Sequence, residues 1–94
     1  MTLFELLESN LDNLDGTVAY VDLEPNPAAV DYWPFDEDDP DPKWSGKLFL
    51  YVVRGKTYEF RQDDLKNSEL VEKKVGRVMF RVGSHTISLL GLPC

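Results

Sequence analysis

The amino-acid sequence predicts a small α+β domain, in which an N-terminal helix packs on a mostly antiparallel sheet of about five strands. Three features support this prediction: a leucine stripe near the N-terminus, two stretches with the pattern of β-hairpins, and a long acidic, proline-rich segment before the first hairpin. The chain has 94 residues, of which 43% are hydrophobic. This length supports one hydrophobic core, so we expect a single domain over residues 1–94.

The first residues have the pattern of a helix N-terminus. Thr2 and Glu5 have the spacing of a capping box, in which each side chain bonds to the backbone N–H of the other residue. A leucine stripe at helical spacing follows, at Leu3, Leu7, Leu11 and Leu14. Gly16 can adopt the left-handed backbone that ends a helix. We therefore expect one helix that begins after Thr2 and stops at Gly16.

A strand and a long loop come next. Apolar residues alternate from Thr17 to Leu23, which indicates a β-strand. From Glu24 to Ser45 the composition changes, because five of the six prolines lie there: Pro25, Pro27, Pro34, Pro40 and Pro42. Proline has no N–H to donate to a β-ladder, so we expect residues 24–45 to form one loop outside the sheet. Loops of this length in compact domains are usually functional or disordered.

Residues 47–61 have the pattern of a hairpin around Arg54-Gly55. A two-residue loop there pairs Val53 with Lys56. The resulting register places two aromatic pairs opposite each other on one face, Tyr51 with Tyr58 and Phe49 with Phe60.

Residues 77–90 predict a second hairpin around Gly83-Ser84, with glycine at the first central position of a type II′ turn. In its register Phe80 faces Ile87 and Val78 faces Leu89. The segment between the hairpins, Gln62 to Val75, fits no single period, and we expect a short helix or turn that leads into an extended stretch.

Charge is distributed unevenly along the chain. Residues 1–42 contain twelve acidic and no basic residues, whereas residues 43–94 contain all ten lysines and arginines and five acids. The formal net charge of −7 therefore combines −12 in the first part with +5 in the second. Three arrangements are compatible with this division: the acidic half packs on the basic half of the same molecule, pairs with a second copy, or faces a basic partner.

Several function classes lack their sequence signature. No apolar run approaches the roughly 20 residues of a membrane-spanning helix, and residues 1–10 lack the basic start of a secretory signal, so we expect a cytoplasmic protein without membrane association. The only cysteine is Cys94 and the only histidine is His85, which excludes an internal disulfide and the usual zinc sites. An EF-hand loop that began at Asp36 would need glycine at Asp41 and an acid at Lys47. We expect no metal and no cofactor.

Catalytic motifs are missing as well. Ser84 and His85 are adjacent, but neighbouring side chains in a strand or turn diverge, and no third residue is placed to orient the histidine. The sequence has no phosphate-binding glycine loop and no dinucleotide-binding fingerprint. We therefore expect a protein that is not an enzyme.

The acidic loop is the best candidate for a binding site. Its aromatic and acidic side chains are Tyr32, Trp33, Phe35, Asp36, Glu37, Asp38, Asp39, Asp41 and Trp44. Exposed acids beside aromatic anchors predict a protein-binding module that docks on a basic surface of another protein, as inhibitors, immunity proteins and nucleic-acid mimics do.

Two alternatives remain open. The chain could self-associate as a structural or adaptor protein, with the acidic half against the basic half of another copy. It could also bind single-stranded nucleic acid by stacking bases on the aromatic side chains of the C-terminal hairpins. The excess of acidic residues disfavours nucleic acid because it repels phosphate.

Overall fold

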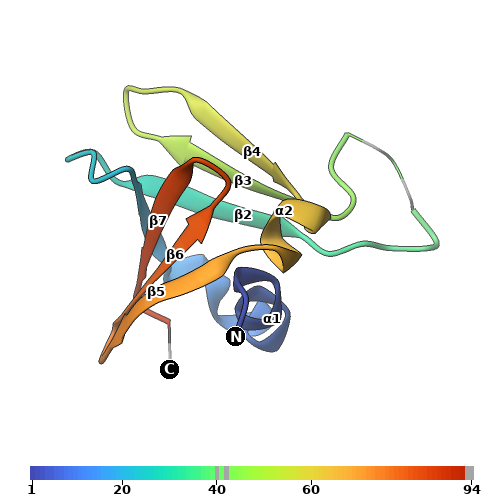
Figure 1. The fold of residues 1–94 in the computed structure, drawn as a ribbon. Helices are drawn as coiled ribbons and strands as arrows, with labels where there is room; N and C mark the ends of the chain where they lie inside the picture. Colours follow the sequence, from blue (N-terminus) through green and yellow to red (C-terminus); the bar gives the residue numbers. More distant parts are fainter. Residues whose placement is uncertain (40, 42, 93–94) are drawn as a thin grey trace.

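The computed structural model describes residues 1–39, 41 and 43–92 (Figure 1). Pro40, Pro42 and Cys94, on which expectations from the sequence also fall, lie outside the described residues. The described chain forms an antiparallel sheet of seven strands with two short α-helices and one 3₁₀-helix. The expected α+β class, with an N-terminal helix and an antiparallel sheet, is confirmed, but the sheet has seven strands and not five.

The N-terminal helix begins as expected. Helix α1 spans Leu3–Ser9, and the capping box is present: Glu5 N–H donates to Thr2 Oγ1 at 3.2 Å, and Thr2 N–H donates to Glu5 Oε1 at 3.0 Å. These two bonds satisfy backbone donors that the first turn of a helix leaves free.

The helix ends earlier than the leucine stripe predicts. The side-chain Nδ2–H of Asn10 donates to the carbonyl of Leu6 at 2.8 Å, and the chain continues as a 3₁₀-helix, η1 (Leu11–Gly16). Asparagine favours such helix ends because its side chain competes for backbone groups. The change of pitch leaves Leu11 43% exposed, whereas Leu6, outside the predicted stripe, is buried. Gly16 does not adopt the expected left-handed backbone.

The sheet joins two antiparallel meanders. Its strands are β1 (Val18–Val21), β2 (Ala28–Trp33), β3 (Lys47–Val52), β4 (Thr57–Arg61), β5 (Glu69–Lys74), β6 (Arg77–Val82) and β7 (His85–Leu90). Their order across the sheet is β4-β3-β2-β1-β7-β6-β5. The first strand therefore pairs with the last, and β1 connects the meander β1–β4 to the meander β5–β7.

The expectation that residues 24–45 form one loop is wrong, because β2 lies within this segment, between β1 and β3. Pro27 precedes the strand and Pro34 follows it, so neither removes an N–H from the ladder. The carbonyl of Pro27 even accepts from Val53 N–H at 3.0 Å. The loop proper is shorter and spans residues 34–46.

The predicted register of the first hairpin is wrong by one residue. Tyr51 lies opposite Thr57, and Leu50 lies opposite Tyr58. Val52 N–H donates to the carbonyl of Lys56 at 3.3 Å, so these two residues face each other. The turn between them spans residues 53–55, one residue more than the expected pair Arg54-Gly55. A one-residue slip moves side chains to the other face of the sheet.

The slip divides the expected aromatic ladder between the two faces of the sheet. Phe49 stacks with Tyr51 on the outer face, with ring centroids 6.1 Å apart. Tyr58 stacks with Phe60 on the core face, at 6.4 Å. The hairpin therefore lacks the four-ring platform on which the nucleic-acid alternative depends.

The second hairpin matches its prediction. Val78 pairs with Leu89 and Phe80 pairs with Ile87. Gly83 adopts a φ of +61° in the turn, where its missing Cβ makes this conformation accessible. The segment between the hairpins is a short helix, α2 (Gln62–Lys66), followed by strand β5, as expected.

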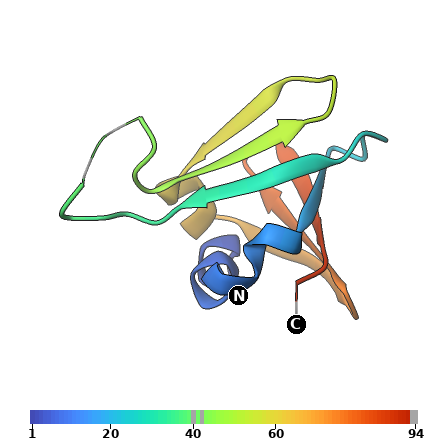
Figure 2. The same cartoon turned by 180° about the vertical axis from the view of Figure 1, so that it is seen from behind.

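The core lies between the sheet and the helical segments. Figure 2 shows α1 and η1 on one side of the sheet, and α2 follows directly on β4. A buried serine links the start of α1 to α2. Leu3 N–H donates to Ser68 Oγ at 2.7 Å, and Ser68 Oγ donates to the carbonyl of Leu65 at 2.6 Å. Leu3 and Leu65 are fully buried. The N-terminus is therefore bound to the connection between the two meanders.

Candidate functional site

The 34–46 loop projects from the end of strands β2 and β3 (Figures 1 and 2). Its ends are held together, because Trp33 at the end of β2 pairs directly with Lys47 at the start of β3. Gly46 makes the last bend with a φ of +73°, a backbone conformation that L side chains rarely adopt. The sheet therefore presents this loop on a fixed base.

Aspartate side chains stabilise the turns within the loop. Asp36 Oδ1 accepts from Asp38 N–H at 2.9 Å, and Asp41 Oδ1 accepts from Lys43 N–H at 2.9 Å. The hydroxyl of Ser45 accepts from Asp36 N–H at 3.2 Å and connects the two arms of the loop. Local bonds of this kind define a loop conformation without burying it in a core.

The two tryptophans lie together at the base of the loop. Trp33 is 45% exposed on the outer face of β2, and its Nε1–H donates to Asp31 Oδ2 at 2.9 Å. Trp44 comes from the returning arm, and the two ring centroids are 6.2 Å apart with planes inclined at 44°. The two indole rings are therefore tilted and do not stack face to face.

A hollow of about 310 Å³ lies beside this pair, and we call it the tryptophan hollow. Its lining residues are Trp33, Pro34, Phe35, Asp36, Asp39, Trp44 and Ser45. Five of the nine residues predicted as a site therefore converge on one cavity, namely Trp33, Phe35, Asp36, Asp39 and Trp44. Sequence reasoning missed Pro34 and Ser45, which have no chemical signature of their own.

The remaining predicted residues are placed differently. Tyr32 faces the core and is 9% exposed, and its hydroxyl donates to Glu8 Oε1 of α1 at 2.7 Å. Burial, followed by the neighbouring Glu8 carboxylate, raises the pKa of the Tyr32 phenol above its ordinary value. Glu37, Asp38 and Asp41 belong to the loop but do not line the hollow.

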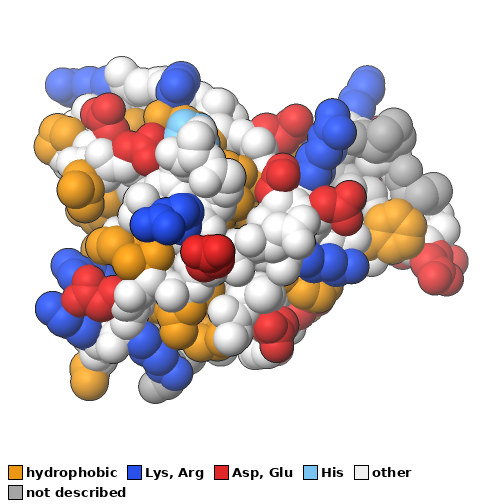
Figure 3. All heavy atoms as spheres, viewed as in Figure 1, with side chains coloured by type: hydrophobic (Ala, Val, Ile, Leu, Met, Phe, Trp, Pro, Cys, Tyr) orange, Lys and Arg blue, Asp and Glu red, His pale blue; other side chains and the backbone are white. Residues whose placement is uncertain are grey.

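The acids of the loop have no cationic partner. None of Asp36, Glu37, Asp38, Asp39 and Asp41 forms an ion pair with a described residue. The Lys and Arg ion pairs of the described chain all join residues of its second half: Lys47–Glu59, Lys74–Glu72, Arg77–Glu72 and Arg81–Glu69. No lysine or arginine ion pair of the described chain therefore neutralises the acidic half, and the one contact of this kind between the halves joins His85 to Asp22 at 2.7 Å. Figure 3 shows acidic side chains on the projecting loop, at the right, beside an exposed hydrophobic side chain.

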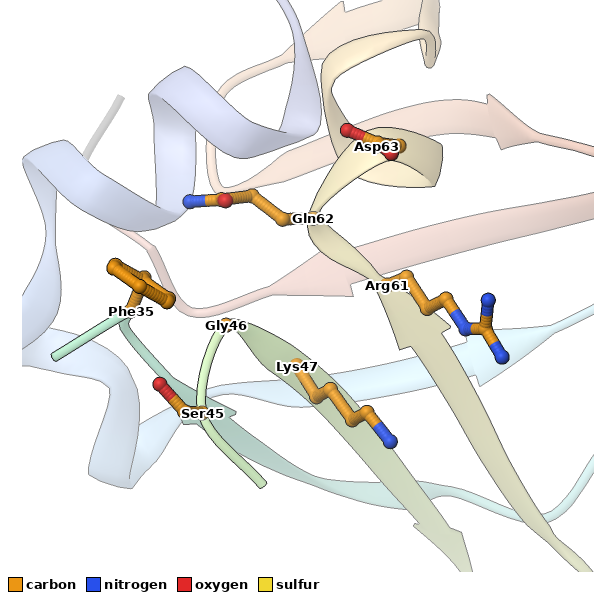
Figure 4. Close-up of a pocket in the computed structure, with 7 residues that line it drawn as sticks. All are labelled: Phe35, Ser45, Gly46, Lys47, Arg61, Gln62 and Asp63. Atoms are coloured by element: carbon orange, nitrogen blue, oxygen red, sulfur yellow. The ribbon is translucent and has the colours of Figure 1, made fainter. Parts of the chain in front are cut away.

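Two basic residues at the base of the loop, Lys47 and Arg61, point away from Phe35 of the loop. A second hollow of about 370 Å³ lies where the loop meets α2, and Phe35 lines both hollows. In Figure 4 the side chains of Lys47 and Arg61 extend side by side, away from Phe35. Lys47 bonds instead to Glu59, at 3.4 Å.

A histidine–aspartate pair lies away from the loop. His85 Nδ1 lies 2.7 Å from Asp22 Oδ2, and the His85 ring packs edge-on against Tyr58 of β4 with centroids 5.2 Å apart. Among the described residues, no serine, threonine or cysteine side chain hydrogen-bonds to His85. The expectation that no residue orients the histidine is therefore wrong, because Asp22, which is distant in the sequence, takes that place; within the described residues no hydroxyl or thiol completes a triad.

Comparison with protein families, with curated proteins and with solved structures finds no match to this chain. Within residues 1–39, 41 and 43–92, no three histidine, cysteine, aspartate or glutamate side chains converge to hold a metal ion. No helix in the described part of the chain has the length and apolarity to cross a membrane.

Proposed function

We propose that this protein is a non-enzymatic binding module that docks its 34–46 loop on a basic surface of another protein. The observation that supports this proposal is the unpaired charge: the five loop acids form no ion pair with a described residue, although the chain has ten lysines and arginines. Negative charge concentrated at one end of a molecule attracts basic surfaces and accelerates encounters with them.

Aromatic side chains of the loop and its base supply the apolar part of the contact. Trp33 and Phe35 are about half exposed, at 45% and 54%. Tryptophan is enriched among the residues that contribute most to the free energy of association, while a surrounding rim of charges contributes mainly rate and specificity. Local hydrogen bonds such as those to Asp36 and Asp41 restrict the backbone before binding, and such restriction reduces the entropy lost on binding.

The test compares two variants with the same change in net charge. The loop variant carries Asp36→Asn, Glu37→Gln, Asp38→Asn, Asp39→Asn and Asp41→Asn. Asparagine keeps the acceptor oxygens that the turns use, so we expect the free energy of unfolding to change by less than about 0.5 kcal/mol. The control variant neutralises five exposed acids elsewhere: Asp12, Asp15, Glu24, Asp63 and Glu69.

Wild type and both variants are used to capture proteins from native lysate, and the captured partner is then purified and its affinity measured at two salt concentrations. We expect the loop variant to lose the partner and the control variant to keep it, with a salt dependence that is reduced only in the loop variant. Equal affinities and equal salt dependence for both variants would contradict the proposal. Salt-sensitive dimers of the purified protein alone would instead favour self-association, and capture of RNA or DNA would favour nucleic-acid binding.

A further inference from the structure

We propose that the tryptophan hollow receives one arginine side chain of the partner. This inference rests on the proposed function and names the group that the site recognises. The volume of about 310 Å³ is at the lower end of ligand pockets, which suits one side chain better than a folded segment.

The aromatic walls favour a cation. Trp33, Phe35 and Trp44 line the hollow from both arms of the loop. The electron-rich face of tryptophan attracts cations more strongly than the face of tyrosine or phenylalanine. The protein already uses weaker versions of this contact, with Lys56 Nζ 4.7 Å from the Tyr58 ring centroid and Lys66 Nζ 4.9 Å from that of Phe4. No described lysine or arginine lies over either tryptophan in the same way.

The carboxylates provide acceptors at the same place. Asp36 lines the hollow, but its Oδ1 already accepts from Asp38 N–H. Asp39 also lines the hollow, and its carboxylate makes no hydrogen bond or ion pair with a described residue. A donor that enters between the tryptophans therefore meets a free carboxylate.

Arginine fits this combination better than lysine does. Its guanidinium group is planar, weakly hydrated and able to stack on an indole face while two of its N–H groups bond one carboxylate. An ammonium group is a compact and strongly hydrated charge that gains less from a broad aromatic wall. Trp33 is 45% exposed, so part of its indole surface is open to such a plane.

The experiment uses the two tryptophans as reporters, since both tryptophans of the chain lie in this hollow. Three capped Gly/Ser peptides carry one arginine, one lysine or one citrulline at the same position, and each is titrated at low salt. Tryptophan fluorescence and the indole N–H resonances measure binding. Citrulline matches the shape of arginine without its charge. We expect the arginine peptide to bind about tenfold more tightly than the citrulline peptide, with lysine between them.

Asp39→Asn is the site variant and Asp15→Asn is the matched control, an exposed acid on η1. We expect Asp39→Asn to remove most of the preference for arginine over citrulline, and Asp15→Asn to leave the preference intact. Equal binding of arginine and citrulline, or lysine binding as tightly as arginine, would overturn the inference. If the loop variant loses the protein partner but the arginine peptide gives no response, the inference fails while the proposed function stands. If the loop variant also keeps its partner, both fail.

Discussion

Replacement of Asp22 tests how the turn between β1 and β2 is held in place. Asp22 and Leu23 are consecutive non-glycine residues with positive φ, at 54° and 62°, and Glu24 N–H closes the turn on the carbonyl of Val21 at 3.0 Å. This is the geometry of a type I′ turn, which normally favours asparagine and glycine. The Asp22 carboxylate accepts from Thr86 N–H at 2.9 Å and lies 2.7 Å from His85 Nδ1.

The size of the effect follows from these contacts. The Asp22 side chain is 40% exposed, so its contact with His85 contributes less than about 1 kcal/mol. Loss of the bond from Thr86 N–H costs about 1 kcal/mol, at the lower end for a charged acceptor because of that exposure. Alanine also tolerates a left-handed backbone less well than aspartate does. We therefore expect Asp22→Ala to lower the free energy of unfolding by about 2 kcal/mol, and Asp22→Asn by less than about 1 kcal/mol.

Low pH should remove part of the stability that the Asp22 carboxylate contributes. The hydrogen bond with His85, and then that from Thr86 N–H, lowers the pKa of Asp22 below its ordinary value of 3.8. A carboxyl group with a lowered folded-state pKa stabilises the fold above its unfolded pKa, and this stabilisation is lost as the pH falls through the folded value. Urea unfolding of wild type and Asp22→Asn should therefore show a difference in the free energy of unfolding that is smaller at about pH 2.5 than at about pH 6. A difference that is absent at the higher pH, or that grows in acid, would refute this account.

Four further substitutions test the fold by urea unfolding. Leu7→Ala should lower the free energy of unfolding by about 2–5 kcal/mol because Leu7 is fully buried, whereas Leu11→Ala should lower it by less than about 1 kcal/mol; equal effects would contradict the break between α1 and η1. Tyr32→Phe should cost about 1–2 kcal/mol through the lost bond to Glu8, and an unchanged midpoint would show that this bond contributes nothing. Leu23→Gly should stabilise by about 0.5–1 kcal/mol, because Leu23 is 78% exposed and glycine relieves its positive φ; a lower midpoint would refute strain there.

Local sequence patterns correctly predicted elements that depend on neighbouring residues, such as the second hairpin. The register around Gly83 followed from alternation in the flanking strands and from one turn glycine. Around Gly55 the same reasoning failed by one residue, because the sequence does not show how many residues the turn contains. Arg54, and not Gly55, adopts the positive φ there.

Strand β2 shows how composition misled the prediction. Ala28, Val30 and Tyr32 alternate on the core side of the strand, a pattern visible in the sequence. The surrounding prolines concealed it, although Pro27 and Pro34 lie outside the strand. Recognition of the strand would also have placed Tyr32 on the opposite face from Trp33.

The sequence identified five of the residues that line the hollow, but not the geometry that brings them together. Acidic and aromatic side chains in one segment indicated a binding surface. Their convergence on a hollow depends on the pairing of Trp33 with Lys47, which brings the two arms of the loop together. A contact of this kind between strands cannot be derived from spacing alone.

The pairing of the first strand with the last has a kinetic consequence. All other neighbours in the sheet are consecutive in the sequence, so each meander can form by local turns. Only the β1–β7 pairing, in which Val21 meets Ile87, requires most of the chain to close on itself. Closing a long loop costs entropy before any contact compensates for it, and folding slows as the sequence separation of contacts increases. Among the strand pairings of the sheet, β1–β7 therefore has the largest cost of loop closure.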